Sequence, residues 1–481
     1  MSKRASLKRN VILNILGSTL PLFISIVTVP LYLKTVGPTR YGILALVWLF
    51  AGYFSLLDFG ISRATVNQIS QTDRDDRVAQ QNIFWSAIWI NVTIGVLGMC
   101  IAYPVAHLVF SHIQFESETI RRELVDAIPW LCLTIPLTVA SAVGLGGLEA
   151  RERFDLANLM QIFGSAATQI APVWVAYHYG VKLNYLILTI VIARIASFVL
   201  LFISLKMAFP LGRPMKWDFA VARKLLAYGS WASVSGIISP VLEALDRFII
   251  GAKLSAADVA LYAVPFSVAD KLRIIPRALA RAAFPKLSGL PDAEARHLFE
   301  RLLKGSLNLM TPMVLVPIFA AKYLLELWIG ASHSSASPII AIILLCGAWF
   351  NSIAVIPFGY MQARGRPNIT ARIHMFEFLP FVGALFVLVN YFGVVGAALA
   401  WSGRMALDCL LLCYVAKIEW RSYKALMINT AVLVASAAWA VFHDVSIPEL
   451  AGLVLAIGVV FLVLNRSMLQ ELIQSKRGKR A

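Results

Sequence analysis

The chain is a succession of long apolar runs separated by short polar connections. A bilayer core of about 30 Å requires about 20 apolar residues in a helix, and the runs approach or exceed that length. They predict membrane-spanning helices at 11 to 33, 41 to 64, 84 to 110, 128 to 149, 158 to 179, 185 to 205, 226 to 251, 259 to 285, 305 to 329, 338 to 362, 373 to 390, 395 to 416, 425 to 442 and 448 to 465. We therefore expect an all-α, polytopic membrane protein with 14 transmembrane helices.

Composition supports this prediction. Hydrophobic residues make up 59% of the chain and charged residues 14%, whereas soluble domains hold about a quarter charged residues. The first run is too long for the apolar core of a signal peptide and has no obvious cleavage site, so it predicts an uncleaved first span.

The distribution of Lys and Arg predicts the orientation. The N-terminal tail, every second connection and the C-terminal tail together hold 28 Lys and Arg, and the other connections hold 6. Positive charge gathers on the cytoplasmic side of membrane proteins. Both termini are therefore expected in the cytoplasm.

The connections are too short to hold an extramembrane catalytic domain, so an enzyme is not expected. The net charge of +17 is spread over many short loops, which gives no basic module for nucleic acid. The seven histidines and five cysteines form no cluster at metal-ligand spacing. We expect no metal and no cofactor, and leave proton or sodium coupling open.

One hairpin of the chain, residues 225 to 285, concentrates charge within apolar runs. Its ionisable residues are Glu243, Asp246 and Arg247 in the first run and Asp270, Lys271, Arg273, Arg277 and Arg281 in the second. An ionisable side chain at bilayer depth is costly unless it faces a water-filled cavity or a partner. Arg273, Arg277 and Arg281 recur every four residues and share a face with Asp270. We interpret Arg273, Lys271, Arg277 and Arg247 as candidate lumen residues; Arg281 is expected to extend to the headgroups.

The carboxylates of this hairpin have several interpretations. Glu243 and Arg247 are one helical turn apart and can neutralise each other. Asp270 lies two turns from Arg277 on the same face and is a candidate for charge pairing or ion coupling. Asp246 then lacks a partner on its own helix, which leaves it to pair with another span or to take up a proton.

Four further charged residues lie inside other spans. Arg194 is isolated near the middle of its span, which predicts a lumen position or a pairing with Asp58 or Asp246. Arg404 and Asp408 are one turn apart and are expected to pair or to face the lumen. Glu377, about one turn inside its span, is expected at the interface.

Short motifs along the chain resemble those of a known family. They are KTVGPTRYG and LLDFGISRA near residues 34 to 65, LDRFIIG at 245 to 251, FPKLS at 284 to 288, QARGRP at 362 to 367 and NYFGVVGAALAW at 390 to 401. In this order they are similar to bacterial polysaccharide flippases of the multidrug and oligosaccharidyl-lipid exporter superfamily. The resemblance extends to about residue 424.

The resemblance implies a V-shaped pair of six-helix bundles with two further helices. The expected domains are an N-terminal bundle at 1–205, a cytoplasmic linker at 206–225, a C-terminal bundle at 226–416, and two additional helices with a basic tail at 417–481. It also implies alternating access in the bacterial inner membrane, with a polyprenyl-pyrophosphate-linked oligosaccharide as cargo. Expected partners are membrane lipids and the polysaccharide polymerase and glycosyltransferases of the same pathway.

Two other transport functions share this scaffold. A cation-coupled multidrug exporter needs acidic lumen residues, but several N-terminal spans carry none. A peptidoglycan-precursor flippase has the same number of spans, and only the order of the motifs favours the polysaccharide branch.

Overall fold

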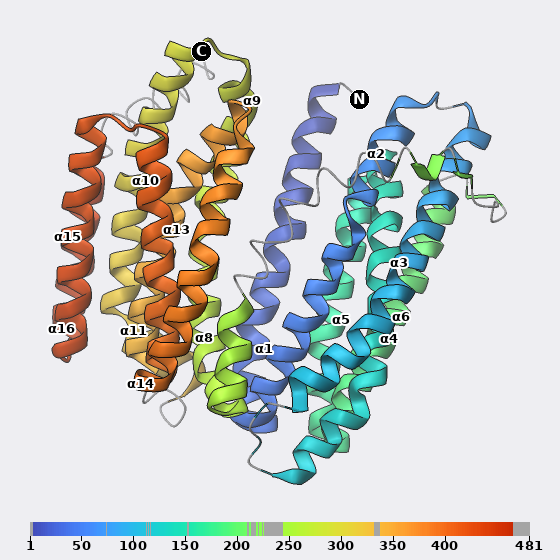
Figure 1. Cartoon of the computed structure of the whole chain (residues 1–481), viewed down its shortest axis with the longest axis horizontal. Coiled ribbons are helices and arrows are strands. Elements are labelled where there is room, and N and C mark those ends of the chain that lie inside the picture. The colour runs from blue at the N-terminus through green and yellow to red at the C-terminus, as the bar shows by residue number, and fades with distance from the viewer. Residues whose placement is uncertain are drawn as a thin grey trace. The chain divides into compact units, whose positions relative to one another are not determined.

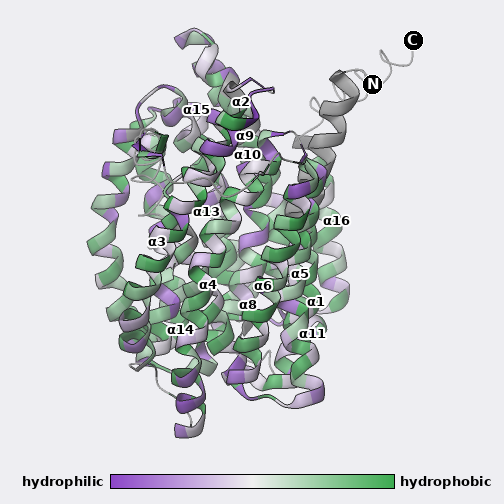
Figure 2. Cartoon of the chain, turned by 90° about the vertical axis from the view of Figure 1, so that its right-hand side faces the viewer, coloured by the Kyte–Doolittle hydropathy of each residue, from purple (hydrophilic) through white to green (hydrophobic). Residues whose placement is uncertain are grey.

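The computed structural model describes residues 3–464 except 74, 112, 114, 116, 152, 209–210, 213–217, 220, 224, 226–243 and 331–336. Every regular element in this described part is a helix, and eight of these helices are long and apolar enough to cross a membrane. Hydrophobic residues cover most of their length in Figure 2. The all-α membrane fold is therefore confirmed. The count of 14 spans stays a prediction, because much of the run 226 to 251 lies outside the described residues.

The chain divides into two compact units, Met1–Ala260 and Leu261–Ala481. The predicted domain limits at 205, 225 and 416 stay predictions. The linker at 206–225 is described only in part.

The first unit is a bundle of long helices that run side by side (Figure 1). Its elements are α1 (Lys3–Phe54), the 3₁₀ helix η1 (Ser55–Asp58), α2 (Ile61–Gln71), α3 (Arg77–Ser111), α4 (Glu118–Ala150), α5 (Phe154–Tyr179) and α6 (Leu183–Ala208). The first two predicted spans both begin within α1, because helical structure resumes directly after the turn at Gly37, which has φ 81° and ψ 165°.

The motif around Gly37 has a physical explanation. A positive φ is readily adopted only by glycine, so Gly37 permits the turn between the two parts of α1. Five residues later, a Cβ on Gly42 would lie 1.8 Å from the carbonyl oxygen of Ala256. The motif GPTRYG therefore combines a turn with a close approach of two backbones.

The core of the first unit packs α3, α4 and α6 together. Phe84, Val143 and Leu205 are almost fully buried in one apolar cluster. A Cβ on Gly147 would lie 3.0 Å from the ring of Phe84. Small residues let helices approach closely in membrane proteins, where packing rather than water exclusion drives helix association.

The second unit contains the remaining helices. They are α8 (Ala256–Leu272), which begins in the first unit, α9 (Ile274–Gly289), α10 (Asp292–Phe319), α11 (Ala321–Ile329), α13 (Ser337–Ala363), α14 (Pro367–Val415), α15 (Trp420–Phe442) and α16 (Ile447–Leu464). The predicted span 305 to 329 is wrong in extent. Helix α10 begins earlier, at Asp292, and ends at Phe319. The rest of the predicted span forms α11, a separate short helix.

Helix α14 holds two predicted spans that fold back on each other. The helical path is interrupted only at Gly393, with φ 57° and ψ −134°. A Cβ on Gly396 would lie 1.9 Å from the carbonyl oxygen of Leu388. The motif NYFGVVG therefore repeats the combination found in α1, a positive-φ glycine followed by a glycine at a close approach.

The connection between α15 and α16 is fastened to α11. Lys322 donates a hydrogen bond to Asp444 over 2.8 Å, and the hydroxyl of Tyr323 donates to the carbonyl oxygen of Val445 over 2.6 Å. The hydrogen bond from Lys322 lowers the pKa of Asp444 from its ordinary value. These contacts fix the last two helices to the second unit.

Candidate functional site

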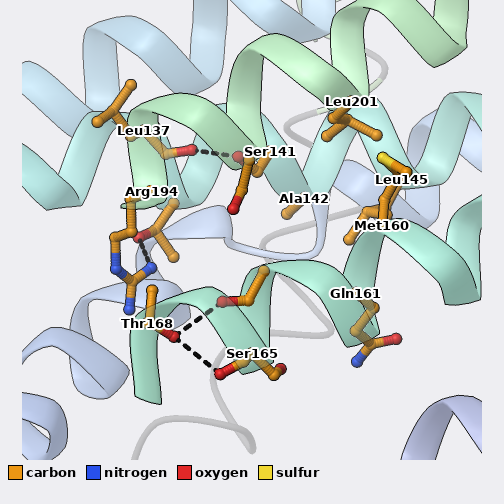
Figure 3. A pocket seen from close by; sticks show the side chains of 13 residues that line it. Leu137, Ser141, Ala142, Leu145, Met160, Gln161, Ser165, Thr168, Arg194 and Leu201 are labelled. Atoms are coloured by element: carbon orange, nitrogen blue, oxygen red, sulfur yellow. Dashed lines mark hydrogen bonds between the residues drawn. The ribbon is translucent and has the colours of Figure 1, made fainter. Parts of the chain in front are cut away.

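A polar cavity of about 430 Å³ lies within the first unit, between α4, α5 and α6 (Figure 3). Its polar lining residues are Thr138 and Ser141 from α4, Gln161, Ser165 and Thr168 from α5, and Arg194 and Ser197 from α6. No carboxylate is among its lining residues. The cavity therefore has a mixed polar and apolar lining, and the charged side chain among its lining residues is a cation.

Arg194 is the charged residue of this cavity. Eleven positions separate it from the first residue of α6, which places it about 17 Å along the helix axis. Its Nη1 donates a hydrogen bond to the hydroxyl of Thr138 over 2.7 Å, and its buried Nε has no hydrogen-bond partner among the described residues. Arg194 therefore lines a cavity within the first unit, with Thr138 rather than Asp58 or Asp246 as its described partner. Its predicted lumen role stays a prediction.

Most hydroxyl groups around Arg194 donate to their own helix. Thr168 donates to the carbonyl oxygen of Gly164 over 2.8 Å, Ser197 to that of Ala193 over 2.7 Å, and Ser141 to that of Leu137 over 2.6 Å. Their oxygens can still accept hydrogen bonds, but their protons are used. Arg194 is thus the strongest donor that the cavity offers to an anion.

Asp58 has a different environment from the one predicted. Its carboxylate accepts hydrogen bonds from the backbone and hydroxyl groups of Ser62 and from the amide of Asn91, the last over 2.7 Å. Asn91 also donates to the carbonyl oxygen of Val139. In the described part of the chain the partners of Asp58 are neutral, and Arg194 is not among them. Asp58 instead caps the start of α2, and through Asn91 it links α2 to α3 and α4.

The first run of the charged hairpin is described from Ala244 onward, and Glu243 lies outside the described residues. Asp246 is fully buried, and its carboxylate accepts a hydrogen bond from the backbone nitrogen of Arg247 over 2.7 Å. The Nε of Arg247 is buried as well. Asp246 therefore lies inside the unit, whereas Arg247 as a whole is partly exposed.

Arg273 marks a break between α8 and α9. Its side chain is 1% exposed, donates to Asn351 over 2.7 Å and to Asp270 over 3.1 Å, and lies over the ring of Trp401. Arg277 also approaches Asp270, at 3.9 Å. The shared face of Asp270, Arg273 and Arg277 is confirmed. Arg273 is buried within the second unit. Its predicted contact with cargo stays a prediction.

The remaining charges of this segment are partly accessible. Lys271 donates to the carbonyl oxygen of Ser267 over 3.2 Å and lies over the ring of Trp328. The side chain of Arg277 is 40% exposed. The side chain of Arg281 lies outside the described part of the structure.

Four ionisable residues form a buried cluster between the two arms of α14. Arg404 approaches Glu377 and His374 approaches Asp408, each at 3.5 Å. The side chain of Glu377 is fully buried between the arms, and its expected position at the membrane interface stays a prediction. The expected pair of Arg404 with Asp408 is replaced by pairs across the arms, because the turn at Gly393 brings the two arms together.

Thr138 and the other hydroxyl residues of the cavity were not predicted as site residues. Ser and Thr are common in membrane helices, where their hydroxyls bond to the preceding turn. Their one distinguishing signal is the number of polar residues on α5, where Gln161, Ser165 and Thr168 fall within two turns.

The sequence matches a family model described as "Polysaccharide biosynthesis protein" over residues 35–338. A putative O-antigen transporter of Shigella flexneri is 28% identical over 416 residues, which cover 85% of this chain and 97% of that protein. A probable low-salt glycan biosynthesis flippase of Haloferax volcanii is 22% identical, and the match covers 79% of this chain and 77% of that protein.

Two solved structures support the fold. The lipid II flippase MurJ in an inward closed conformation superposes with a TM-score of 0.73 at 14% identity, over 96% of this chain and all of its own. An inward-facing multidrug resistance MATE transporter gives a TM-score of 0.67 at 13% identity, over 86% of this chain and 99% of its own. These relatives are transporters rather than enzymes. The chain therefore belongs to the polysaccharide biosynthesis protein family and is a multi-pass membrane protein with the fold of these transporters.

Proposed function

We propose that the protein moves a polyprenyl-pyrophosphate-linked oligosaccharide from the cytoplasmic to the outer leaflet of the bacterial inner membrane. Both termini then lie in the cytoplasm, as the distribution of Lys and Arg predicts. The observation that carries the proposal is Arg194, a cation at the middle of a membrane helix that lines a polar cavity without a carboxylate.

The chemistry of Arg194 suits a pyrophosphate. A guanidinium stays charged at any physiological pH and offers parallel N–H groups that match two phosphate oxygens. The bond from Nη1 to Thr138 orients the guanidinium at the edge of the cavity. An anionic headgroup in the cavity would pair with this guanidinium.

Transport requires that this binding change during the cycle. A site with equal affinity in the inward and outward states could not bias the cycle, since only differential affinity shifts a conformational equilibrium. We propose alternating access of the two predicted six-helix bundles, in which the arginine holds the headgroup in one state and releases it in the other.

The cavity also bears on the drug-exporter alternative. An organic cation would be repelled by Arg194, and the lining provides no carboxylate to attract it. The cavity therefore favours an anionic cargo over a cationic one. The Shigella relative supports an O-antigen-type cargo over a peptidoglycan precursor.

The test is transfer of a short polyprenyl-pyrophosphate-linked sugar between the leaflets of reconstituted vesicles, with and without a proton or sodium gradient. We expect transfer by the wild type and a loss of about tenfold or more in Arg194→Ala, because a hydrogen bond to a charged group contributes about 1.5–3 kcal/mol. Arg194→Lys keeps the positive charge but loses the parallel N–H groups of the guanidinium, so this variant is expected to transfer the lipid-linked sugar at an intermediate rate.

The control is Arg122→Ala, which removes an arginine whose side chain is 77% exposed. It should transfer as the wild type does. Equal transfer by Arg194→Ala and the wild type would remove Arg194 from the cargo route. No transfer by the wild type under any gradient would contradict the proposed function itself.

A further inference from the structure

A groove of about 760 Å³ lies at the end of the second unit where α9 finishes and α10 begins. It is lined by Lys286, Gly289 and Leu290 from the end of α9 and by Ala293, Glu294, His297, Leu298 and Arg301 from the start of α10. The groove is separate from the cavity of Arg194, which lies in the first unit.

The lining has two chemical parts. Gly289, Leu290, Ala293 and Leu298 provide an apolar surface, and Lys286, His297, Arg301 and Glu294 provide polar and charged groups. With histidine neutral, two cations oppose one carboxylate. An apolar surface edged by net positive charge matches an amphiphile with an anionic headgroup.

Neighbouring basic residues at this end already have protein partners. Arg296 donates to the carbonyl oxygen of Ala416 over 2.7 Å and pairs with Glu300, and Lys304 pairs with Glu419 over 3.6 Å. By contrast, Lys286 and Arg301 form no ion pair with any described residue, and both are exposed. The two cations that line the groove are the ones left available to an external anion.

Arg364 fixes the shape of the groove. Its guanidinium reaches from the end of α13 and donates to the carbonyl oxygens of Leu287 and Leu290, and it pairs with Asp292 at the start of α10. The α9–α10 turn is therefore held from outside the groove. A rigid site loses less conformational entropy when it binds a ligand.

We expect the groove at the level of lipid headgroups, because it lies at the start of α10, before the apolar run of that helix. The first turns of α10 read DAEARHLFERLLK, and the apolar run follows only after Lys304. The lining residues lie on the exposed side of α10, opposite the buried Phe299 and Leu303. Basic pockets between helices at the cytoplasmic surface are typical sites for anionic lipid headgroups.

The groove is also remote from the buried arginine of the α8–α9 break. Lys286 is 13 residues from Arg273, or about 20 Å along the helix axis. A peripheral position of this kind suits a lipid that stays bound while cargo passes. Anionic phospholipids supply a phosphodiester together with acyl chains for the apolar surface.

We propose that this groove binds the headgroup of an anionic phospholipid of the inner leaflet, with its phosphate held by Lys286 and Arg301. The bound lipid bridges the end of α9 and the start of α10. The site is independent of the cargo, so it stands whether or not the proposed transport function does.

The test is binding of phosphatidylglycerol, titrated against phosphatidylcholine, to the full-length protein in detergent, counted by native mass spectrometry and followed by thermal unfolding. Each basic contact with an anionic lipid contributes about 1 kcal/mol, or about fivefold. The double variant Lys286→Gln/Arg301→Gln should therefore bind phosphatidylglycerol about 25-fold more weakly and lose the lipid-dependent rise in melting temperature.

The matched control is Arg421→Gln/Lys424→Gln, which removes two exposed cations near the start of α15 outside the groove. It should bind as the wild type does, and both double variants should unfold like the wild type without lipid. Equal weakening in the two variants would overturn the proposal in favour of general surface attraction. A parallel titration with a polyprenyl phosphate identifies the source of the phosphate: tighter, groove-dependent binding of that lipid would overturn the choice of a phospholipid.

Discussion

Single residues at bilayer depth follow two different rules in this protein. Arg194 lines a cavity that has no carboxylate among its lining residues, whereas Arg404 lies beside Glu377 within the protein interior. A buried ion pair gains little over apolar packing, but removal of one partner leaves an uncompensated charge. Arg194 is therefore suited to an external anion, and Arg404 to holding the arms of α14 together.

The buried cluster makes a prediction about stability. Arg404→Gln should lower the free energy of unfolding by about 3 kcal/mol or more, because Glu377 and Asp408 would remain buried beside each other without the guanidinium. Glu377→Gln should cost less, since the side-chain carbonyl oxygen of glutamine can still accept a hydrogen bond from Arg404. The double variant should recover much of the loss.

The measurement is thermal unfolding of the three purified variants in one detergent, treated as a double-mutant cycle. Additive losses would contradict a direct interaction of Arg404 with Glu377. Transfer activity of Glu377→Gln, measured in parallel, separates the stability of the cluster from any role in transport.

For single residues, the sequence located the charged side chains within the spans but did not identify their partners. The depth of Arg194 could be read from the apolar residues around it. Its bond to Thr138, 56 positions earlier, depends on how α4 and α6 pack. The burial of Glu377 could not be predicted, because the position of a residue within a span does not reveal which arm folds over it.

At the scale of elements, two motifs of the sequence prove to be backbone devices. GPTRYG and NYFGVVG each place a positive-φ glycine before a glycine in close contact with another backbone. The sequence located both turns. It did not reveal the close approach of Gly42 to Ala256, because that contact joins segments more than 200 residues apart.

Gly42→Ala should destabilise the protein by several kcal/mol, since its Cβ would lie 1.8 Å from a backbone oxygen and the backbones must shift. Gly52→Ala in the same helix is the matched control, because its Cβ would meet nothing within 4 Å. Alanine has a higher helix propensity than glycine, so this control should be neutral or slightly stabilising. Melting temperatures of the two variants decide the question, and similar losses in both would contradict the close approach.

At the scale of the whole molecule, the imbalance of Lys and Arg predicts the orientation. It can be tested with single cysteines in a background without the five native ones. We expect an impermeant maleimide to label Lys182→Cys in intact cells and Ser288→Cys only after permeabilisation, because they lie on opposite predicted sides. The reverse pattern would mean an inverted protein.

Both positions are exposed ends of helices in the described structure, so failure to label cannot be attributed to burial. The all-α architecture followed from the apolar runs alone. The break that separates α11 from α10 could not be predicted in this way. Both segments are apolar, and a separate short helix has the same composition as the continuation of a longer one.

The turn at Gly393 has a consequence for how the protein is made. The residues around it, from Tyr391 to Gly396, include no charged side chain, and the carboxylate of Glu377 on the first arm approaches Arg404 on the second. An arm that left the ribosome and entered the lipid alone would expose Glu377 to hydrocarbon. We therefore expect the translocon to release both arms together, as a finished helical hairpin in which Glu377 already lies beside Arg404.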